Sequence, residues 1–377
     1  MHDLAGGLRI LVSGENLKKG GGQTVLRSTL SELASRPGVD CTALVPTGFT
    51  GSCPDPVREQ VSLRERPRWS PGLVRRLSRD HDVLFSMGNW AVPSVRVPQV
   101  VLCHWPYALY DDPEIWAGMA WRDRLLRTAK RSLFGMLAGQ ADLVLLQTSV
   151  ARHRFEERHP GIPTEVLPNV VPTRLVEESR RIHESRPPDR RPRILVLARY
   201  YPHKNFEVLL PLAERIARQG LGWTLVTTLD PNEGPGARAF LERAGRGEAA
   251  EVIENVGPIP AEGLTAAYRG SAAVLLPSLL ESFSGVYLEA MAFGVPVVTS
   301  DRDFARAVCG EAATYVDPLD PDDVLHGLRS VLTDEQWRLT LTARGRDRLA
   351  TFPSAEDVGA RLIEILTRAT ALRRGTR

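Results

Sequence analysis

The sequence predicts an α/β protein with two open parallel sheets, each wrapped by helices. Short apolar runs without polar alternation recur along the 377 residues, which is typical of parallel strands buried on both faces. Helical stretches separate these runs, so strand and helix alternate. A polar stretch near the middle divides the series, and a chain of this length exceeds one ordinary core. Two domains are therefore expected.

The first domain is expected over residues 1–175. Its strands are predicted at residues 8–13, 41–46, 83–86, 99–103 and 142–147. A glycine run follows the first strand, and a helix is predicted over 23–35. Residues 176–193 are charged and contain Pro187 and Pro188, which favours a linker.

The second domain is expected over residues 194–352. Strands are predicted at 193–197, 223–228, 251–255, 272–276, 295–299 and 314–316, with a helix over 205–219 that ends at Gly220. From Pro321 onward the pattern is mostly helical, and residues 353–377 form a C-terminal helix.

Composition narrows the class of protein. The chain is 43% hydrophobic and 25% charged, as in globular proteins. No apolar run approaches ~18 residues and the first residues lack a signal pattern, so a cytoplasmic protein without a membrane helix is expected. The four cysteines include no Cys-x-x-Cys pair, which favours free thiols over zinc. No basic stripe interleaved with aromatic residues suggests a nucleic-acid partner.

The strongest motif is PSLLESFSGVYLEAMAFGVPVV, residues 277–298. Glu281 lies in a loop at the carboxyl end of a strand, where parallel sheets bind ligands, and Glu289 lies within the following helix. The first N–H groups of that helix, at Ser284, Gly285 and Val286, suit an anion or a sugar hydroxyl. A carboxylate such as Glu289 can accept both hydroxyls of a ribose. Taken alone, the carboxylate of Glu281 could have only a structural role, which is to stabilise the following helix by interacting with its dipole.

This motif resembles that of the retaining GT-B glycosyltransferases of glycosyltransferase family 4 (glycosyl transferases group 1). The resemblance lies in two glutamates separated by seven residues, followed by Leu-Glu-Ala-Met-Ala-x-Gly-x-Pro-Val. The family commonly has Glu-Gly-Phe-Gly where this chain has Glu281, Ser282, Phe283 and Ser284. The resemblance implies a GT-B fold of two Rossmann-like domains facing an interdomain cleft. It further implies transfer from a sugar nucleotide (UDP-, GDP- or dTDP-sugar) with retention, without another cofactor.

A second motif, LARYYPHKNF, begins at Leu197 directly after a predicted strand. Arg199 and Lys204 lie in a strand-to-helix loop, which is a usual place for phosphate. The resemblance implies that they hold the donor diphosphate and act in catalysis together with Glu281, which we expect to bind the sugar hydroxyls. It also implies donor contacts for Phe283, Ser284, Gly285, Val286 and Glu289, and for Gly257 and Ile259 near the nucleotide base.

Further candidates lie in the first domain. Gly21 and Gly22 belong to a glycine run that is neither a Walker A loop nor a dinucleotide fingerprint. The resemblance implies that they face the donor phosphates. His104 ends a predicted strand, and the resemblance implies that it contacts the transferring sugar as a catalytic residue, although a lone histidine is more often structural. Asn89 and Trp105 are weaker acceptor candidates. The sequence around Pro353 resembles the point where the chain crosses back to the first domain.

Three further expectations concern partners. No essential metal is predicted, because Arg199 and Lys204 can neutralise a diphosphate. The acceptor is a glycan, a lipid-linked glycan or a secondary metabolite, and a GT-B epimerase or a non-catalytic sugar-nucleotide-binding subunit remains an alternative. Residues 121–137 combine apolar residues with cations, which predicts either peripheral contact with anionic lipid or a helix packed on the first sheet.

Overall fold

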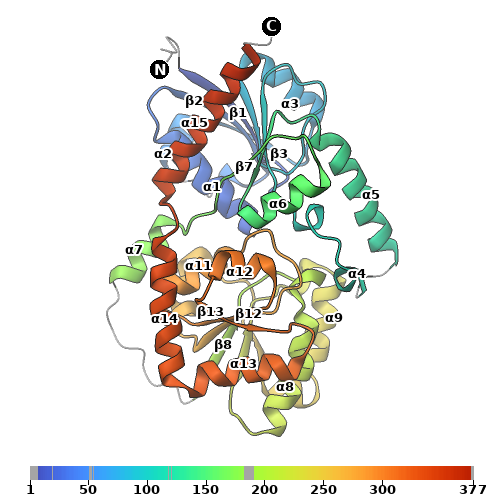
Figure 1. The fold of residues 1–377 in the computed structure, drawn as a ribbon, viewed down its shortest axis with the longest axis vertical. Coiled ribbons are helices and arrows are strands. Elements are labelled where there is room, and N and C mark those ends of the chain that lie inside the picture. The colour runs from blue at the N-terminus through green and yellow to red at the C-terminus, as the bar shows by residue number, and fades with distance from the viewer. Residues whose placement is uncertain are drawn as a thin grey trace. The chain divides into compact units, whose positions relative to one another are not determined.

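The computed structural model describes residues 7–18, 20–50, 53, 55–117, 119, 121–181 and 191–374. The chain forms two compact units (Figure 1). The first unit contains Met1–Tyr110, Trp121–Pro172 and Pro353–Arg377, and the second contains Asp111–Ala120 and Thr173–Phe352. Each unit is an open parallel sheet with helices on its faces, so the predicted fold class is confirmed.

The sheet of the first unit has seven parallel strands in the order β3-β2-β1-β4-β5-β6-β7. They are β1 (Leu8–Ser13), β2 (Val39–Pro46), β3 (Val61–Arg66), β4 (Val83–Ser86), β5 (Gln99–Leu102), β6 (Leu143–Leu146) and β7 (Thr164–Val166). The five central strands were predicted. The sequence analysis missed β3 and β7, which form the two edges and, apart from the buried Val61, carry half-buried or exposed residues instead of an apolar run.

The helices of the first unit are α1 (Gly21–Ala34), α2 (Asp55–Gln60), α3 (Pro71–Leu77), α5 (Trp121–Ala138), α6 (Ser149–Arg158) and α15 (Ala355–Arg374). Helices α1 and α15 lie side by side and share one core with the sheet. Leu26 and Leu30 of α1 and Ile365 and Leu366 of α15 are all fully buried there. The last helix of the chain therefore completes the core that the first strand begins.

The sheet of the second unit has six parallel strands in the order β10-β9-β8-β11-β12-β13. They are β8 (Arg193–Val196), β9 (Thr224–Thr227), β10 (Ile253–Asn255), β11 (Ala273–Leu276), β12 (Val297–Ser300) and β13 (Ala313–Val316). All six were predicted. Its helices are α4 (Pro113–Ala117), α7 (Thr173–Arg181), α8 (Leu209–Arg218), α9 (Pro235–Ala244), α10 (Leu264–Arg269), α11 (Gly285–Ala292), α12 (Asp303–Cys309), α13 (Pro321–Thr333) and α14 (Glu335–Ala350).

Three boundaries differ from those expected. The first part of the expected linker, up to Arg181, is the helix α7, and residues 182–190 lie outside the described residues. The segment Asp111–Ala120 belongs to the second unit, although it lies within the expected first domain. The helix predicted from residue 205 begins only at Leu209, because Asn205 adopts a left-handed conformation (φ 54°) between two short 3₁₀ turns.

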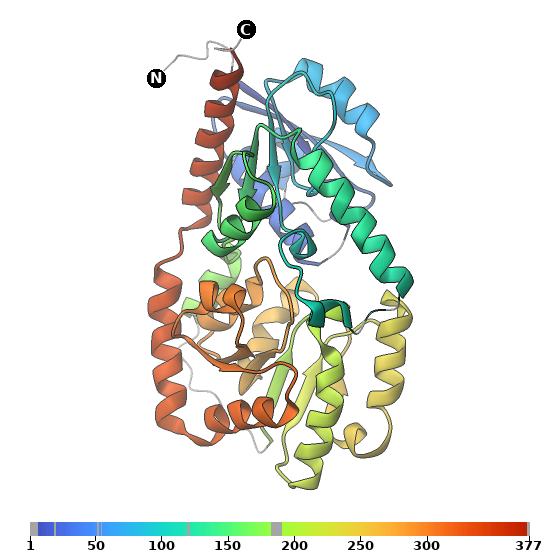
Figure 2. The same cartoon turned by 45° about the vertical axis from the view of Figure 1, so that its right-hand side comes forward.

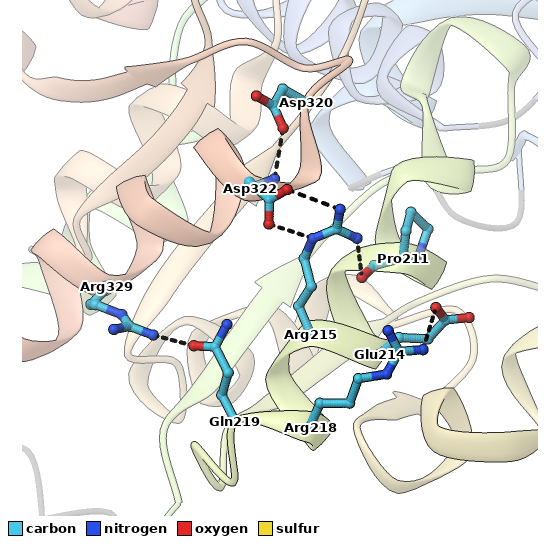
Figure 3. A network of polar contacts seen from close by, with 8 residues as sticks. All are labelled: Pro211, Glu214, Arg215, Arg218, Gln219, Asp320, Asp322 and Arg329. Carbon is cyan, nitrogen blue, oxygen red and sulfur yellow. Dashed lines mark hydrogen bonds and ion pairs between the residues drawn. The ribbon is translucent and has the colours of Figure 1, made fainter.

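Helices α8 and α13 of the second unit are joined by a polar network (Figure 3). The guanidinium of Arg215 donates to both carboxylate oxygens of Asp322, at 3.0 Å for the longer bond, and to the carbonyl of Pro211. Asp320 caps α13 by accepting from the N–H of Asp322 at 2.8 Å. The guanidinium of Arg329 on α13 donates to the side-chain oxygen of Gln219 at the end of α8. This network fixes one flank of the second unit without entering the candidate site.

The four cysteines are buried free thiols, and burial raises the pKa of Cys41 and Cys103 to about 12. Such thiols are poor nucleophiles at neutral pH. Within the described part of the chain, we find no helix long and apolar enough to cross a bilayer.

Candidate donor site and the polar cluster of the first unit

Two loops of the second unit meet at the carboxyl edge of its sheet. One follows β8 and contains Arg199 and Lys204, and the other follows the neighbouring strand β11 and contains Glu281. The N–H of Leu279 donates to the carbonyl of His203 at 2.8 Å and ties the loops together. Parallel neighbours end at the same edge, which is why residues about 80 apart in sequence become adjacent.

Lys204 and Glu281 form an ion pair at this junction. Both side chains are largely buried, with 16% and 8% exposed. The hydroxyl of Ser278 donates to the same carboxylate oxygen of Glu281 at 3.0 Å. The residues expected to hold the diphosphate and the sugar thus contact each other, so a ligand that approaches one affects the other.

Arg199 has a carboxylate partner that the sequence analysis missed. Its Nε lies 2.8 Å from Oε1 of Glu233, whose Oε2 accepts from the N–H of Tyr200 at 2.9 Å. The Glu233 side chain is only 8% exposed. Glu233 lies in the 3₁₀ turn Pro231–Glu233 after β9, which is the neighbour of β8 in the sheet. An acidic residue directly after this strand could have identified Glu233 as a site residue from the sequence.

Glu289 lies one turn into α11 and is paired with a buried tyrosine. Its Oε2 accepts from the hydroxyl of Tyr268 at 2.6 Å. Burial raises the pKa of Glu289, whereas the hydrogen bond from Tyr268 lowers it. The ring of Tyr268 stacks on Phe293 at 5.3 Å, which fixes the direction of its hydroxyl. Tyr268 could not be identified from the motif, because it lies on a different helix, α10.

The remaining donor candidates fall into two groups. Ser284 is buried and extended, and α11 begins at Gly285, followed by Val286, so the start of this helix is placed as expected. Gly257 adopts φ +74° and lies with Ile259 in the loop after β10.

Phe283 differs from the other donor candidates, since its buried ring packs against Phe352 at 6.2 Å. The observed contact of Phe283 is therefore with the protein.

The glycine run of the first unit starts a helix. Gly20 adopts φ 67°, and α1 begins at Gly21. A Cβ at Gly21 would meet no atom within 4 Å, whereas one at Gly22 would lie 3.1 Å from Leu17. Packing within the protein therefore does not require glycine at position 21, which leaves space beside the backbone there.

His104 and Asn89 form a hydrogen-bonded pair after β5 and β4. Oδ1 of Asn89 accepts from the N–H of His104 at 2.6 Å, and its Nδ2 lies 3.3 Å from Nε2 of the imidazole. Asn89 is held in a left-handed conformation (φ 71°). Before it, Gly88 accepts from Asn16 at 2.8 Å, and a Cβ at Gly88 would lie only 1.9 Å from Oδ1 of Asn16. Burial lowers the pKa of His104 to about 4, so its imidazole is neutral at pH 7.

A row of half-buried tryptophans adjoins this pair. The rings of Trp69 and Trp90 are 6.2 Å apart, and those of Trp90 and Trp105 are 6.0 Å apart. Phe134 of α5 packs edge-on against both Trp90 and Trp105. We refer to Trp69, Trp90 and Trp105 as the tryptophan row.

Glu15 is a buried acid that the sequence analysis did not single out. It follows β1, is fully buried, and accepts from the hydroxyl of Ser13 at 2.9 Å and more weakly from the N–H of Ser70 at 3.5 Å. Burial raises the pKa of Glu15. Its position directly after the first strand could have identified Glu15 as a candidate site residue from the sequence. No group of three His, Cys, Asp or Glu side chains suited to a metal occurs among the residues described.

The two parallel sheets, each wrapped by helices, correspond to the GT-B fold. Residues 177–348 match the family model "Glycosyl transferases group 1". Several curated relatives are named as glycosyltransferases. The chain is 26% identical to MMP alpha-(1->4)-mannosyltransferase from Mycolicibacterium hassiacum, over 75% of this chain and 68% of that protein. It is 28% identical to D-inositol 3-phosphate glycosyltransferase from Kribbella flavida, over 72% and 63% respectively.

A shorter match has higher identity. The chain is 37% identical to O-antigen chain mannosyltransferase B from Escherichia coli over 100 residues, which is 26% of each protein. The matched region thus spans about a quarter of that relative and less than two thirds of the one from Kribbella flavida.

Solved structures share the whole fold. Sucrose-phosphate synthase from Thermosynechococcus elongatus superposes with a TM-score of 0.75 at 15% identity, covering 97% of this chain and 100% of that one. HepE from Anabaena, in complex with UDP-glucose, also gives 0.75 at 14% identity, covering 96% and 100%. At such identity these matches establish the fold.

Proposed function

We propose that this protein is a retaining glycosyltransferase of family 4 that moves a hexose from a nucleotide-diphosphate sugar to a hydroxyl acceptor. One observation carries the proposal: the loops after β8 and β11 bring Arg199, Lys204 and Glu281 to one sheet edge. Cations and carboxylates together suit a ligand with both a diphosphate and a sugar. The group 1 match at residues 177–348 and the glycosyltransferase relatives support it.

In the proposed reaction, the bond between the anomeric carbon and the diphosphate breaks, and a bond forms to the acceptor oxygen on the same face of the sugar. The proton of the acceptor hydroxyl passes to the departing phosphate oxygen. Arg199, Lys204 and the start of α11 stabilise the charge that develops on this leaving group. Such preorganised donors contribute ~3–4 kcal/mol each.

The carboxylates have separate roles in this scheme. Glu281 accepts hydrogen bonds from the sugar hydroxyls, and its pairing with Lys204 holds it in place before the donor arrives. Glu289 accepts from the ribose hydroxyls, while the hydrogen bond from Tyr268 orients its carboxylate and favours the charged form against the effect of burial. Gly257 and Ile259 contact the base, and Gly21 and Gly22 face the phosphates, with open space beside the backbone at Gly21.

The acceptor is assigned to the first unit, at Asn89, His104 and Trp105. The neutral imidazole of His104 can form a hydrogen bond with a hydroxyl, and the half-buried rings of the tryptophan row suit the apolar face of a sugar. We therefore favour a glycan or a lipid-linked glycan over other acceptors. Two of the relatives are named as mannosyltransferases and HepE is in complex with UDP-glucose, so mannosyl and glucosyl donors are the first to test.

The test is a panel of UDP-, GDP- and dTDP-sugars, screened by thermal shift and followed by NMR of the reaction mixture. The proposal predicts one preferred donor that is slowly hydrolysed or transferred, with the anomeric configuration retained in the first product. Inversion at the anomeric carbon would exclude the retaining mechanism. Interconversion of the donor sugar would identify an epimerase, and tight binding without turnover would identify a non-catalytic subunit.

A further inference from the structure

Helix α5 exposes most of its large apolar side chains. The exposed fractions are 69% for Trp121, 63% for Leu125, 61% for Leu126, 44% for Leu133 and 70% for Met136. We call these five residues the apolar face of α5. Only four other large hydrophobic residues are comparably exposed in the described chain: Tyr201, Val256, Leu319 and Leu339. Single exposed residues are ordinary, but a cluster on one helix indicates an interaction site.

The apolar face points away from the unit that carries it. At 100° per residue, its members fall within roughly 140° of the helix circumference. Phe134 and Ala138 lie on the opposite side, where they are buried, and Phe134 packs on Trp90, Trp105 and Phe155. Figure 2 shows α5 along the outside of the first unit. The alternative expectation, that the apolar stripe packs on the first sheet, is therefore wrong for these five residues, because α5 is anchored through Phe134 instead.

The charge of α5 indicates what covers this face. The helix contains Arg122, Arg124, Arg127, Lys130 and Arg131 but a single acid, Asp123. Arg122, Arg124 and Lys130 are exposed, and the guanidinium of Arg122 lies over the ring of Trp121 at 5.3 Å. A second copy of the helix would bring like charges together. An anionic lipid surface instead offers negative headgroups to the cations and acyl chains to the apolar face.

We propose that α5 is an interfacial helix, which docks the protein on an anionic phospholipid bilayer with its apolar face among the headgroups and upper acyl chains. Phe134 is the link to the candidate acceptor site, because it contacts two members of the tryptophan row from the inner side of the same helix. Docking through α5 thus places that row directly behind the membrane-bound helix, close to the surface where a lipid-linked acceptor resides. Vesicle binding requires no transfer, so this inference stands or falls separately from the proposed activity.

The experiment is co-sedimentation of the full chain with phosphatidylcholine vesicles containing roughly one third phosphatidylglycerol, at ~0.05 M and ~0.5 M salt. Three variants are compared with the parent: the triple exchange Leu125→Gln, Leu126→Gln and Met136→Gln; the double exchange Arg122→Gln and Lys130→Gln; and Leu339→Gln with Arg346→Gln as a matched control. The control residues are exposed on α14 of the other unit. Circular dichroism and thermal midpoints verify that each variant is folded.

We expect binding to anionic vesicles at low salt that weakens at high salt and is negligible on pure phosphatidylcholine. The triple variant should lose tenfold or more of its partition coefficient, at about 0.8 kcal/mol for each buried methylene. The double variant should lose about fivefold for each cation removed. The control should bind as the parent does. Absence of binding by folded protein at low salt, or equal binding by the triple variant, would overturn the proposal. Dimerisation that the triple variant abolishes, without vesicle binding, would assign the face to a second copy instead.

Discussion

Lys204 and Glu281 are paired across 77 residues of sequence, and the hydroxyl of Ser278 donates to the same carboxylate oxygen of Glu281. We predict that Lys204→Met and Glu281→Gln each reduce kcat by ~10²-fold or more, since each removes a group proposed to act on the leaving diphosphate or the sugar. The double variant should be only slightly worse than either, because paired residues act as one unit. Arg218→Met, which breaks an exposed ion pair of α8, is the control. Additive losses would show that the pair does not function together.

Glu233 is predicted to position Arg199. In Glu233→Gln the guanidinium loses its charged partner, while the amide oxygen can still accept from Tyr200, so the fold should persist. We expect KM for the donor to rise about tenfold, with a smaller change in kcat. Steady-state kinetics over a range of donor concentrations measure both. Glu233→Asp should recover part of the loss. A variant with parental kinetics would mean that Arg199 needs no such support.

Tyr268 and Glu289 are predicted to govern nucleotide affinity. Glu289→Gln should weaken binding of the nucleotide product by ~1–3 kcal/mol in calorimetry, as for the loss of a charged hydrogen bond. The hydrogen bond from Tyr268 lowers the pKa of Glu289, so Tyr268→Phe should raise that pKa further above its usual range. As the pH is lowered, nucleotide affinity of Tyr268→Phe should therefore begin to fall at a higher pH than that of the parent. Unchanged affinity in both variants would remove Glu289 from the ribose site.

His104 is predicted to make stability depend on pH. Its folded pKa, about 4, lies below the value of 6.5 for a free histidine, because burial disfavours the charged ring. Between these values the unfolded chain takes up a proton that the folded chain refuses, so stability falls as pH decreases from about 6.5 to about 4. His104→Gln should lose this component. Thermal midpoints at stepped pH measure the difference, with the exposed His326→Gln as control. A constant difference between parent and variant across this range would contradict the assignment.

Transfer is predicted not to require a divalent metal, because Arg199, Lys204 and the start of α11 can neutralise the leaving group. Dialysis against EDTA should leave kcat within about twofold. Activity that disappears with EDTA and returns with Mg²⁺ or Mn²⁺ would show that the cations do not suffice.

The sequence allowed the central strands to be predicted, because strands buried on both faces are apolar throughout. It did not reveal β3 and β7, since an edge strand has one exposed side and reads like a loop. Glu281 and Glu289 could be found within one motif. Their partners Lys204 and Tyr268 come from other segments, and only the strand order brings them together. The Lys204–Glu281 contact itself was not predicted, because sequence spacing does not indicate which loop residues touch.

The same limit applies to α5. Its period identifies an amphipathic helix, but the period does not say whether the apolar side faces the protein or the solvent. The orientation of α5 depends on which of its residues pack against the first unit, and these are the buried Phe134 and Ala138.

The return of the C-terminal segment to the first unit affects the order in which the two units can fold during synthesis. Helix α15 supplies Leu362, Ile365 and Leu366 to the core of the first unit but follows the entire second unit in the sequence. On the ribosome, the second unit has all its strands and helices before the first unit receives its closing helix. The unit whose synthesis starts first is therefore finished last, and until α15 emerges, the apolar side of α1 lacks its partner. A nascent chain in that state presents exposed leucines, which chaperones bind.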